Sequence, residues 1–195
     1  MENPQNEISR VVSLLTTASS PDVQEATFER YVTHDVGFRH PVCRVNPGPG
    51  SRDQLLGVYQ WYRIISPTVL ARVENVVYDK ENNVVFLEVV QKFHIRISPF
   101  RAQWSRLIVR LTLREIDGLQ YIAFQEDFYH PDDFANLIIP PLAPLVRFAL
   151  HGAAVASNVY ATAGQLLGYW RPRRNTGTAS VHHETKGLYD GHRTE

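Results

Sequence analysis

The segment YVTHDVGFRHP at residues 31–41 decides the fold, together with the stretch SRDQLLGVYQWYRIIS at residues 51–66. Residues 31–41 indicate a short extended segment that ends in a His-Pro step. The turn-forming run NPGPGS at residues 46–51 then leads into residues 51–66. The second predicts a helix, because its apolar and aromatic residues recur on one face: Leu55, Tyr59 and Tyr62. A short strand followed by an aromatic helix predicts the start of a small domain built around a pocket.

Helices are predicted before this segment and strands after it. Apolar residues at helical spacing predict a helix over residues 5–18, and Ser20 with Pro21 begins a second one. The period then changes to that of strands, with four candidates at residues 68–78, 84–97, 104–116 and 119–130. Their separators are short enough for hairpins, so the sheet should be antiparallel. This order predicts an α+β domain in which a strongly curved sheet wraps around N-terminal helices.

The C-terminal part is predicted to be a helical segment followed by a tail. Residues 131–170 predict helices broken at Pro140-Pro141 and at Pro144. We therefore expect a first domain over residues 1–135, a helical extension over 136–170 and a polar tail over 171–195. The extension approaches the length of a membrane span, but its small residues and Arg147 favour a helix packed over the pocket mouth or a partner. Peripheral contact of residues 142–174 with a membrane is the alternative.

Composition limits the classes of function. The 195 residues suit one domain plus a tail, and Lys+Arg balances Asp+Glu at 20 each, so there is no basic surplus for nucleic-acid binding. One cysteine excludes an intrachain disulfide, and the eight histidines lack a metal-ligand spacing, so we expect no metal. No phosphate loop, nucleophile elbow or dinucleotide fingerprint occurs, so we expect no cofactor. The polar first residues, with no apolar run after them, predict an intracellular, cytoplasmic protein.

Four phrases carry a family resemblance: FRHPVCRV, YQWYRIISP, FLEVVQKFHIRISPFR and QEDFYHPDDF. With the element order, they resemble the nuclear transport factor 2-like superfamily over about residues 5–135, and within it the fungal proteins called SigF-like. That superfamily includes ketosteroid isomerase, scytalone dehydratase and SnoaL-like polyketide cyclases. The resemblance implies a conical α+β barrel with a deep apolar pocket and a homodimer formed through the convex sheet face. It does not imply one activity, because the superfamily holds isomerases, dehydratases, cyclases and binding modules.

His40 is the first candidate for chemistry. In ketosteroid isomerases a carboxylate base stands before a proline at the end of this strand, and the residue that matches it here is His40. Histidine can also exchange a proton near neutral pH; a histidine whose ring bonds the backbone of a turn is an equal alternative. Phe38 shares its face by strand alternation and should line the pocket. Arg39 points the other way and is a candidate anchor for a substrate oxygen, with a surface salt bridge as its alternative.

The helix at residues 51–66 and the two central strands supply candidates for substrate binding. Tyr62 falls on the inner face of the helix and is a candidate donor to a carbonyl or alkoxide, although an aromatic stripe is more often core. Gln91 is the one polar residue on the apolar face of its strand and is expected to orient the substrate. Tyr59 and Trp61 are further candidates for lining the pocket, and Trp104 for gating its mouth.

The strand at residues 119–130 carries one carboxylate on each face. Alternation places Glu126 with Phe124 and Phe128, where an apolar setting would suit proton transfer, and Asp127 with Tyr129. The sequence slightly favours Glu126, while a solvent or interface role is the common alternative for either. Phe124 and Tyr129 are counted among the pocket residues.

These observations lead to two hypotheses on function. The first is a cofactor-independent isomerase or cyclase, for a rearrangement or pericyclic-type step on an apolar intermediate of fungal secondary metabolism. Its proton would be moved by His40 or Glu126 and its charge stabilised by Arg39 or Tyr62, or the pocket would act by shape alone. The second hypothesis is a binding module for lipids or small ligands, with contact to a membrane.

Overall fold

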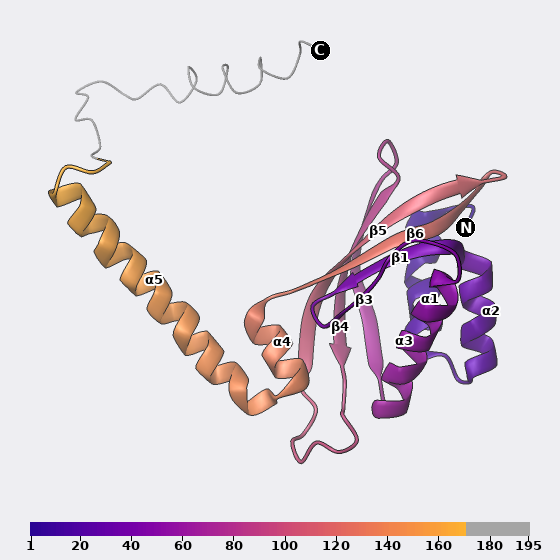
Figure 1. Ribbon diagram of the computed structural model, residues 1–195, viewed down its shortest axis with the longest axis horizontal. Coiled ribbons are helices and arrows are strands. Elements are labelled where there is room, and N and C mark those ends of the chain that lie inside the picture. The colour runs from indigo at the N-terminus through magenta and orange to yellow at the C-terminus, as the bar shows by residue number, and fades with distance from the viewer. Residues whose placement is uncertain (171–195) are drawn as a thin grey trace, which may run out of the picture. The chain divides into compact units, whose positions relative to one another are not determined.

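A computed structural model describes residues 1–170 of the chain (Figure 1). The polar tail predicted at residues 171–195 lies outside the described residues. The chain forms two units, the first from Met1 to Ala149 and the second from Leu150 onward. The first unit holds both the sheet and the N-terminal helices, and the residues discussed as a site all belong to it.

The elements follow the order expected from the sequence. Two helices, α1 (Pro4–Thr17) and α2 (Pro21–Tyr31), come first, and α3 (Ser51–Ile65) lies between the second and third strands. The C-terminal helices are α4 (Pro131–Ile138), the short 3-10 helix η1 (Pro140–Leu142) and α5 (Ala143–Leu166). The strands are β1 (Val32–His40), β2 (Cys43–Val45), β3 (Leu70–Asp79), β4 (Val84–Lys92), β5 (Trp104–Ile116) and β6 (Leu119–Tyr129).

Local signals explain where the helices begin. The Ser20 side chain accepts a hydrogen bond from the backbone N–H of Val23, and Pro21 occupies the first turn of α2, where no N–H partner is needed. Gly50 precedes α3 with a φ of 74°, a conformation that favours glycine. Pro144 does not break α5, because it falls in the first turn of that helix.

The six strands form one sheet in the order β2-β1-β6-β5-β4-β3. Strands β3 to β6 are joined by antiparallel pairs, as their short connections predicted. The expectation of a wholly antiparallel sheet is wrong at one place, since β1 runs parallel to β6. The long stretch of chain between β1 and β6, which holds α3 and four strands, allows this, because a parallel neighbour needs a long connection.

Strand β4 is shorter than predicted. It ends at Lys92 instead of residue 97, because the following backbone bonds to the end of α3. The N–H of His94 donates to Ser66 Oγ at 2.9 Å, and the N–H of Arg96 donates to the carbonyl of Ile65 at 2.8 Å. These bonds replace the ladder that a longer strand would have made with β5.

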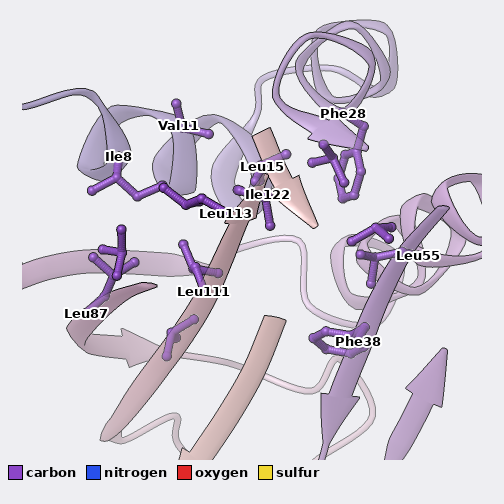
Figure 2. Packing of buried hydrophobic residues seen from close by; sticks show 14 of the residues in the cluster. Ile8, Val11, Leu15, Phe28, Phe38, Leu55, Leu87, Leu111, Leu113 and Ile122 are labelled. Atoms are coloured by element: carbon purple, nitrogen blue, oxygen red, sulfur yellow. The ribbon is translucent and has the colours of Figure 1, made fainter. Parts of the chain in front are cut away.

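The core lies between the N-terminal helices and the concave face of the sheet (Figure 2). Figure 1 shows α1, α2 and α3 together on one side of the strands. Ile8, Val11 and Leu15 recur on one face of α1 and are buried in the same core cluster as the sheet residues Leu111 and Leu113. Burial of such side chains contributes about 1.5–3 kcal/mol each, so α1 is held to the sheet by its apolar stripe.

The C-terminal helical region has an unusual composition. Residues Pro140–Leu166 are long and apolar enough to cross a membrane by length and composition alone, with a mean hydropathy of 1.2. Within α5, no charged residue follows Arg147. The first unit includes α4, η1 and the start of α5, and thus reaches beyond residue 135.

Candidate functional site

A cavity of about 290 Å³ lies between the concave face of the sheet and α1, α3 and α4. Most of its lining is aliphatic or aromatic, from residues such as Leu15, Val89 and Leu107. Its polar side chains are few, and they come from β1, α3, β4 and β6: His40, Tyr59, Tyr62, Gln91, Gln125, Asp127 and Tyr129, besides Thr16 of α1. A small apolar cavity with a few convergent polar groups is typical of a site for a small molecule.

Asp127 is the one carboxylate among the lining residues. Its surroundings desolvate the carboxylate and raise its pKa to about 7, although a hydrogen bond from Gln125 acts in the opposite direction. Gln125 Nε2 donates to Asp127 Oδ1 at 2.9 Å, and Gln125 Oε1 accepts from the Tyr59 hydroxyl at 2.9 Å. Tyr59 therefore orients the amide of Gln125, which in turn fixes the carboxylate of Asp127.

His40 stands at the end of β1 inside an aromatic cluster. Its ring lies 5.4 Å from that of Tyr129 and 6.1 Å from that of Phe38, centroid to centroid. Burial lowers the His40 pKa to about 4, so the imidazole is neutral at pH 7. Nδ1 accepts the backbone N–H of Val42 at 3.3 Å, which leaves the proton of the neutral ring on Nε2. His40 thus bonds the backbone of a turn, as its alternative role predicted, and its ring also lines the cavity. Proton exchange by His40 stays a prediction.

Two further hydroxyls lie in the cavity. Gln91 Nε2 donates to the Tyr129 hydroxyl oxygen at 2.7 Å, so that the Tyr129 proton remains free to be donated. The Tyr62 hydroxyl lies 3.7 Å from Cys43 Sγ. Burial raises the pKa of both tyrosines far above the ordinary value, and Asp127 adds to the rise. Both hydroxyls therefore stay protonated and can act as donors.

A β-bulge in β6 decides which of its residues reach the cavity. Thr112 of β5 pairs with Phe124 and the next residue, Leu113, pairs with Ile122, so Ala123 is the extra residue of β6. Ile122 consequently lines the cavity together with Gln125 and Asp127, although strict alternation had placed it on the opposite face.

The structure brings eight of the predicted site residues together around the cavity. They are Phe38, His40, Tyr59, Trp61, Tyr62, Gln91, Asp127 and Tyr129. Trp61 is half-exposed, at 50% of its surface, and lies at the cavity's edge. These positions agree with the face assignments made by alternation on β1, β4 and the second half of β6.

The other four predicted residues lie outside the cavity lining. Glu126 faces the outer side of the sheet, where it pairs with Arg110 at 2.9 Å and with Arg39 at 3.6 Å. The apolar setting expected for Glu126 is replaced by two guanidinium groups, and Arg39 forms the surface salt bridge that was its alternative role. Trp104 is half-exposed beneath the amine of Lys92, and Phe124 packs against Gly37.

Several residues of the site could not be predicted from the sequence alone. Gln125 was visible on the face shared by Asp127 and Tyr129, but its link to Tyr59 requires the packing of α3 against the sheet. Phe134, Leu137 and Ile138 reach the cavity from α4, whereas the sequence predicted only that the helical extension would pack over the pocket mouth or a partner. In the part of the chain that the structure describes, no group of three or more His, Cys, Asp or Glu side chains could hold a metal ion.

Comparison with solved structures gives the fold. An NTF2-like protein from Anabaena variabilis superposes with a TM-score of 0.50 at 11% identity, over 68% of this chain and 92% of its own. An NTF2-like protein of unknown function from Exiguobacterium sp. gives 0.49 at 9% identity, over 65% and 99%. A protein from Catenulispora acidiphila with a ketosteroid isomerase-like fold, solved with trimethylamine, gives 0.47 at 15% identity, over 65% and 90%.

The search of curated proteins found no match to the chain. The family comparison does give one, to the SigF NTF2-like domain, over residues 1–169. The match includes α4 and α5 as well as the sheet, so these C-terminal helices are part of the family's domain. The element order, the curved sheet and the cavity between sheet and helices agree with it. The chain belongs to the SigF NTF2-like domain family.

Proposed function

We propose that this chain is a cofactor-independent isomerase or cyclase that moves a proton within an apolar intermediate of secondary metabolism. The observation that carries the proposal is Asp127, a carboxylate inside an apolar cavity with its pKa raised to about 7. General acid-base catalysis works best with a group whose pKa lies near the working pH. The apolar lining favours an uncharged, hydrophobic substrate, and the cyclic or unsaturated ketones are the simplest class that fits this chemistry.

In the proposed reaction, the Asp127 carboxylate takes a proton from a carbon next to a substrate carbonyl. The C–H electron pair forms a C=C bond, and the carbonyl π pair moves to oxygen, which gives an enolate. Tyr62, Tyr129 and the Nε2–H of His40 would donate hydrogen bonds to that oxygen. When the substrate has a C=C bond one carbon further from the carbonyl, the enolate is a dienolate. Return of the proton from Asp127 to its far carbon then re-forms the carbonyl and completes an isomerisation. Attack of the enolate carbon on a second carbonyl of the same molecule would instead close a ring, with the π pair of that carbonyl moving to its oxygen, which takes the proton from Asp127.

This scheme gives His40 a role different from that of a base. With a pKa of about 4, its neutral ring carries one proton at pH 7 and can donate it in a hydrogen bond. The proton-transfer role moves to Asp127, because Glu126 points to the outer face and is held between two arginines.

A simple ketone tests the proposal. In D₂O, the wild-type chain should accelerate conversion of 3-cyclohexen-1-one to its conjugated isomer, with deuterium incorporation followed by NMR. Asp127→Asn should lower the rate on the order of a hundredfold, because the general base is lost. Glu126→Gln should keep the wild-type rate, because that carboxylate lies outside the cavity. Equal losses in the two variants, or no acceleration by the wild type, would contradict the proposal.

The second candidate function is a ligand-binding module without catalysis. It is favoured by the aromatic and aliphatic lining, which would bind an apolar ligand whether or not a proton moves. The probe 2-naphthol separates the two functions, since it binds such cavities and has no ketone to isomerise. Quenching of its fluorescence by the protein, combined with no deuterium exchange in 3-cyclohexen-1-one, would leave only the binding role.

The assembly and location form the last part of the proposal. We infer that two chains pair through the outer face of the sheet, where Val77, Phe86, Ile108 and Phe128 are all more than 40% exposed.

We infer too that residues 142–174 touch a membrane surface from inside the cell, because α5 is long, apolar and free of charge after Arg147.

A further inference from the structure

Exposed apolar side chains lie at the end of the sheet where the cavity opens. Only two cavity-lining residues in the described chain are classed as exposed, Val42 and Trp61, at 55% and 50%, and they mark the opening. The end of α3, the start of β3, the start of β5 and residues 93–103 lie together at the lower end of the sheet in Figure 1. The exposed residues on these segments, which we call the mouth rim, are Trp61, Ile64, Leu70, Ile97, Phe100 and Trp104.

The mouth rim is highly exposed and anchored at its base. Ile97 is 92% exposed and Ile64 is 68% exposed. Several large apolar side chains exposed close together mark an interaction surface more often than a single exposed one does. Residues 93–103 are tied to the end of α3 by the two hydrogen bonds that also end β4, one to Ser66 Oγ and one to the carbonyl of Ile65. Trp61, Ile64 and Ile97 are thus presented at the end of the sheet where the cavity opens. At the same end, Leu70 and Trp104 lie in one cross-strand row with Lys92, which faces the outer side of the sheet because the neighbouring Gln91 lines the cavity.

Cationic residues are interspersed with these apolar side chains. Arg63, Arg96 and Arg101 belong to the same segments, and Lys92 ends β4 next to them. The Lys92 amine lies 6.0 Å from the centre of the Trp104 ring. No Asp or Glu occurs between residues 54 and 73 or between residues 89 and 114. None of these four cations forms an ion pair with a carboxylate of the described residues.

The acidic groups on neighbouring elements are already engaged. Glu74 pairs with Arg72, and Glu88 pairs with Arg106. On α4, Asp132 pairs with Arg147, and Asp133 accepts the backbone N–H of Arg106. The opening therefore presents a cationic and apolar surface.

We propose that the mouth rim docks on an anionic lipid bilayer, so that an apolar substrate passes directly between the bilayer and the cavity. Tryptophan and large aliphatic side chains insert at the level of the headgroups, where lysine and arginine bind anionic lipids. The positive charge of Arg63, Lys92, Arg96 and Arg101 beside the mouth rim complements a membrane that contains phosphatidylserine. The delivery of substrate rests on the proposed function, whereas the docking itself does not. This contact is separate from the one proposed for residues 142–174.

The positions of the tryptophans allow a direct test. Of the three tryptophans in the chain, Trp61 and Trp104 belong to the mouth rim and Trp170 does not. In the full chain carrying Trp170→Phe, all tryptophan fluorescence comes from the mouth rim. Vesicles of phosphatidylcholine and phosphatidylserine with brominated acyl chains should quench this fluorescence, and high salt should reduce the quenching.

A charge variant with a matched control sharpens the test. Lys92→Gln, Arg96→Gln and Arg101→Gln together should weaken vesicle binding on the order of a hundredfold, because each basic side chain near an anionic surface contributes about fivefold. The control combines Arg10→Gln, Arg52→Gln and Lys80→Gln, which removes the same charge away from the mouth rim, and it should bind almost as the wild type does. Ile97→Ser with Phe100→Ser should reduce quenching without changing the fold, as followed by circular dichroism.

Three results would overturn the docking proposal. One is the absence of quenching in the Trp170→Phe chain while the wild type still binds vesicles, which would assign binding to residues 142–174 alone. Another is equal quenching by phosphatidylcholine alone. The third is dissociation of an oligomer by the mouth-rim variants without any effect on lipid, which would make the mouth rim a protein interface. The rate on dissolved 3-cyclohexen-1-one, which needs no membrane, reports on the proposed function independently.

Discussion

Asp127 and Glu126 are neighbours in β6, but the protein surrounds them in opposite ways. Asp127 lies in the cavity with a single amide donor, and its pKa rises to about 7. Glu126 lies on the outer face between Arg110 and Arg39. Because consecutive residues of a regular strand face opposite sides, the sequence predicted that only one of the two carboxylates would reach the cavity. It could not show which one, because the arginines around Glu126 come from β1 and β5.

The raised pKa of Asp127 predicts how Asp127→Asn changes stability. Between about pH 4 and pH 7 the folded chain keeps a proton that the unfolded chain releases, so the wild type loses stability as pH rises through that range. Asparagine cannot ionise and escapes this loss. Asp127→Asn should therefore be more stable than the wild type by about 2–4 kcal/mol near pH 8, and nearly equal near pH 4. Urea unfolding at the two pH values measures the difference.

Glu126→Gln serves as the comparison for that measurement. It breaks the ion pairs with Arg110 and Arg39, so it should lower stability near pH 8 where Asp127→Asn raises it. A stability difference for Asp127→Asn that does not depend on pH would show that its carboxylate is not desolvated in the folded protein.

At the scale of elements, the pairing of β1 with β6 depends on one glycine. Gly37 of β1 lies opposite Phe124 of β6. A Cβ added at Gly37 would lie 2.3 Å from the Phe124 ring and 2.8 Å from Pro47 Cγ, and real Cβ atoms do not approach so closely. The ring and the proline fill the space that the missing side chain leaves, which lets the two strands lie side by side in the parallel arrangement.

Gly37→Ala should therefore destabilise the chain by about 3 kcal/mol, through overpacking between β1 and β6. Gly57→Ala in α3 is the matched control, since nothing lies within 4 Å of its added Cβ. It should be neutral or stabilising by about 0.5–1 kcal/mol, because alanine favours the helix. Thermal unfolding followed by circular dichroism gives both values. Equal effects of the two substitutions would mean that the contact with Phe124 is not tight.

Periodicity was sufficient to predict most elements of the first unit. It placed the N-terminal helices, the aromatic helix and the four long strands, because each has a regular apolar face. It missed the end of β4, which hydrogen bonds from α3 determine, and it missed the parallel pairing of β1 with β6. The bulge at Ala123 could not be predicted either, because an extra residue in a strand does not change its composition. The bulge nevertheless brings Ile122 into the cavity lining.

At the scale of the whole first unit, the sheet has two apolar surfaces with different roles. The concave face closes around the cavity. The outer face carries a stripe across four strands, formed by Val77, Phe86, Ile108 and Phe128. Val77 pairs with Phe86 and Ile108 pairs with Phe128. The ion pairs Arg106–Glu88 and Arg110–Glu126 lie on either side of Ile108.

An apolar stripe with a charged border is what a self-complementary interface needs, since a two-fold axis places the same patch on both chains. A charge near the middle of the stripe would then meet its own copy. Ile108→Lys should convert a dimer into a monomer, as measured by light scattering after gel filtration, with secondary structure unchanged. Ile116→Lys, at the far end of β5 and 38% exposed, is the control and should remain a dimer. A wild-type chain that is monomeric at high concentration would contradict the proposed pairing and leave the stripe exposed to solvent.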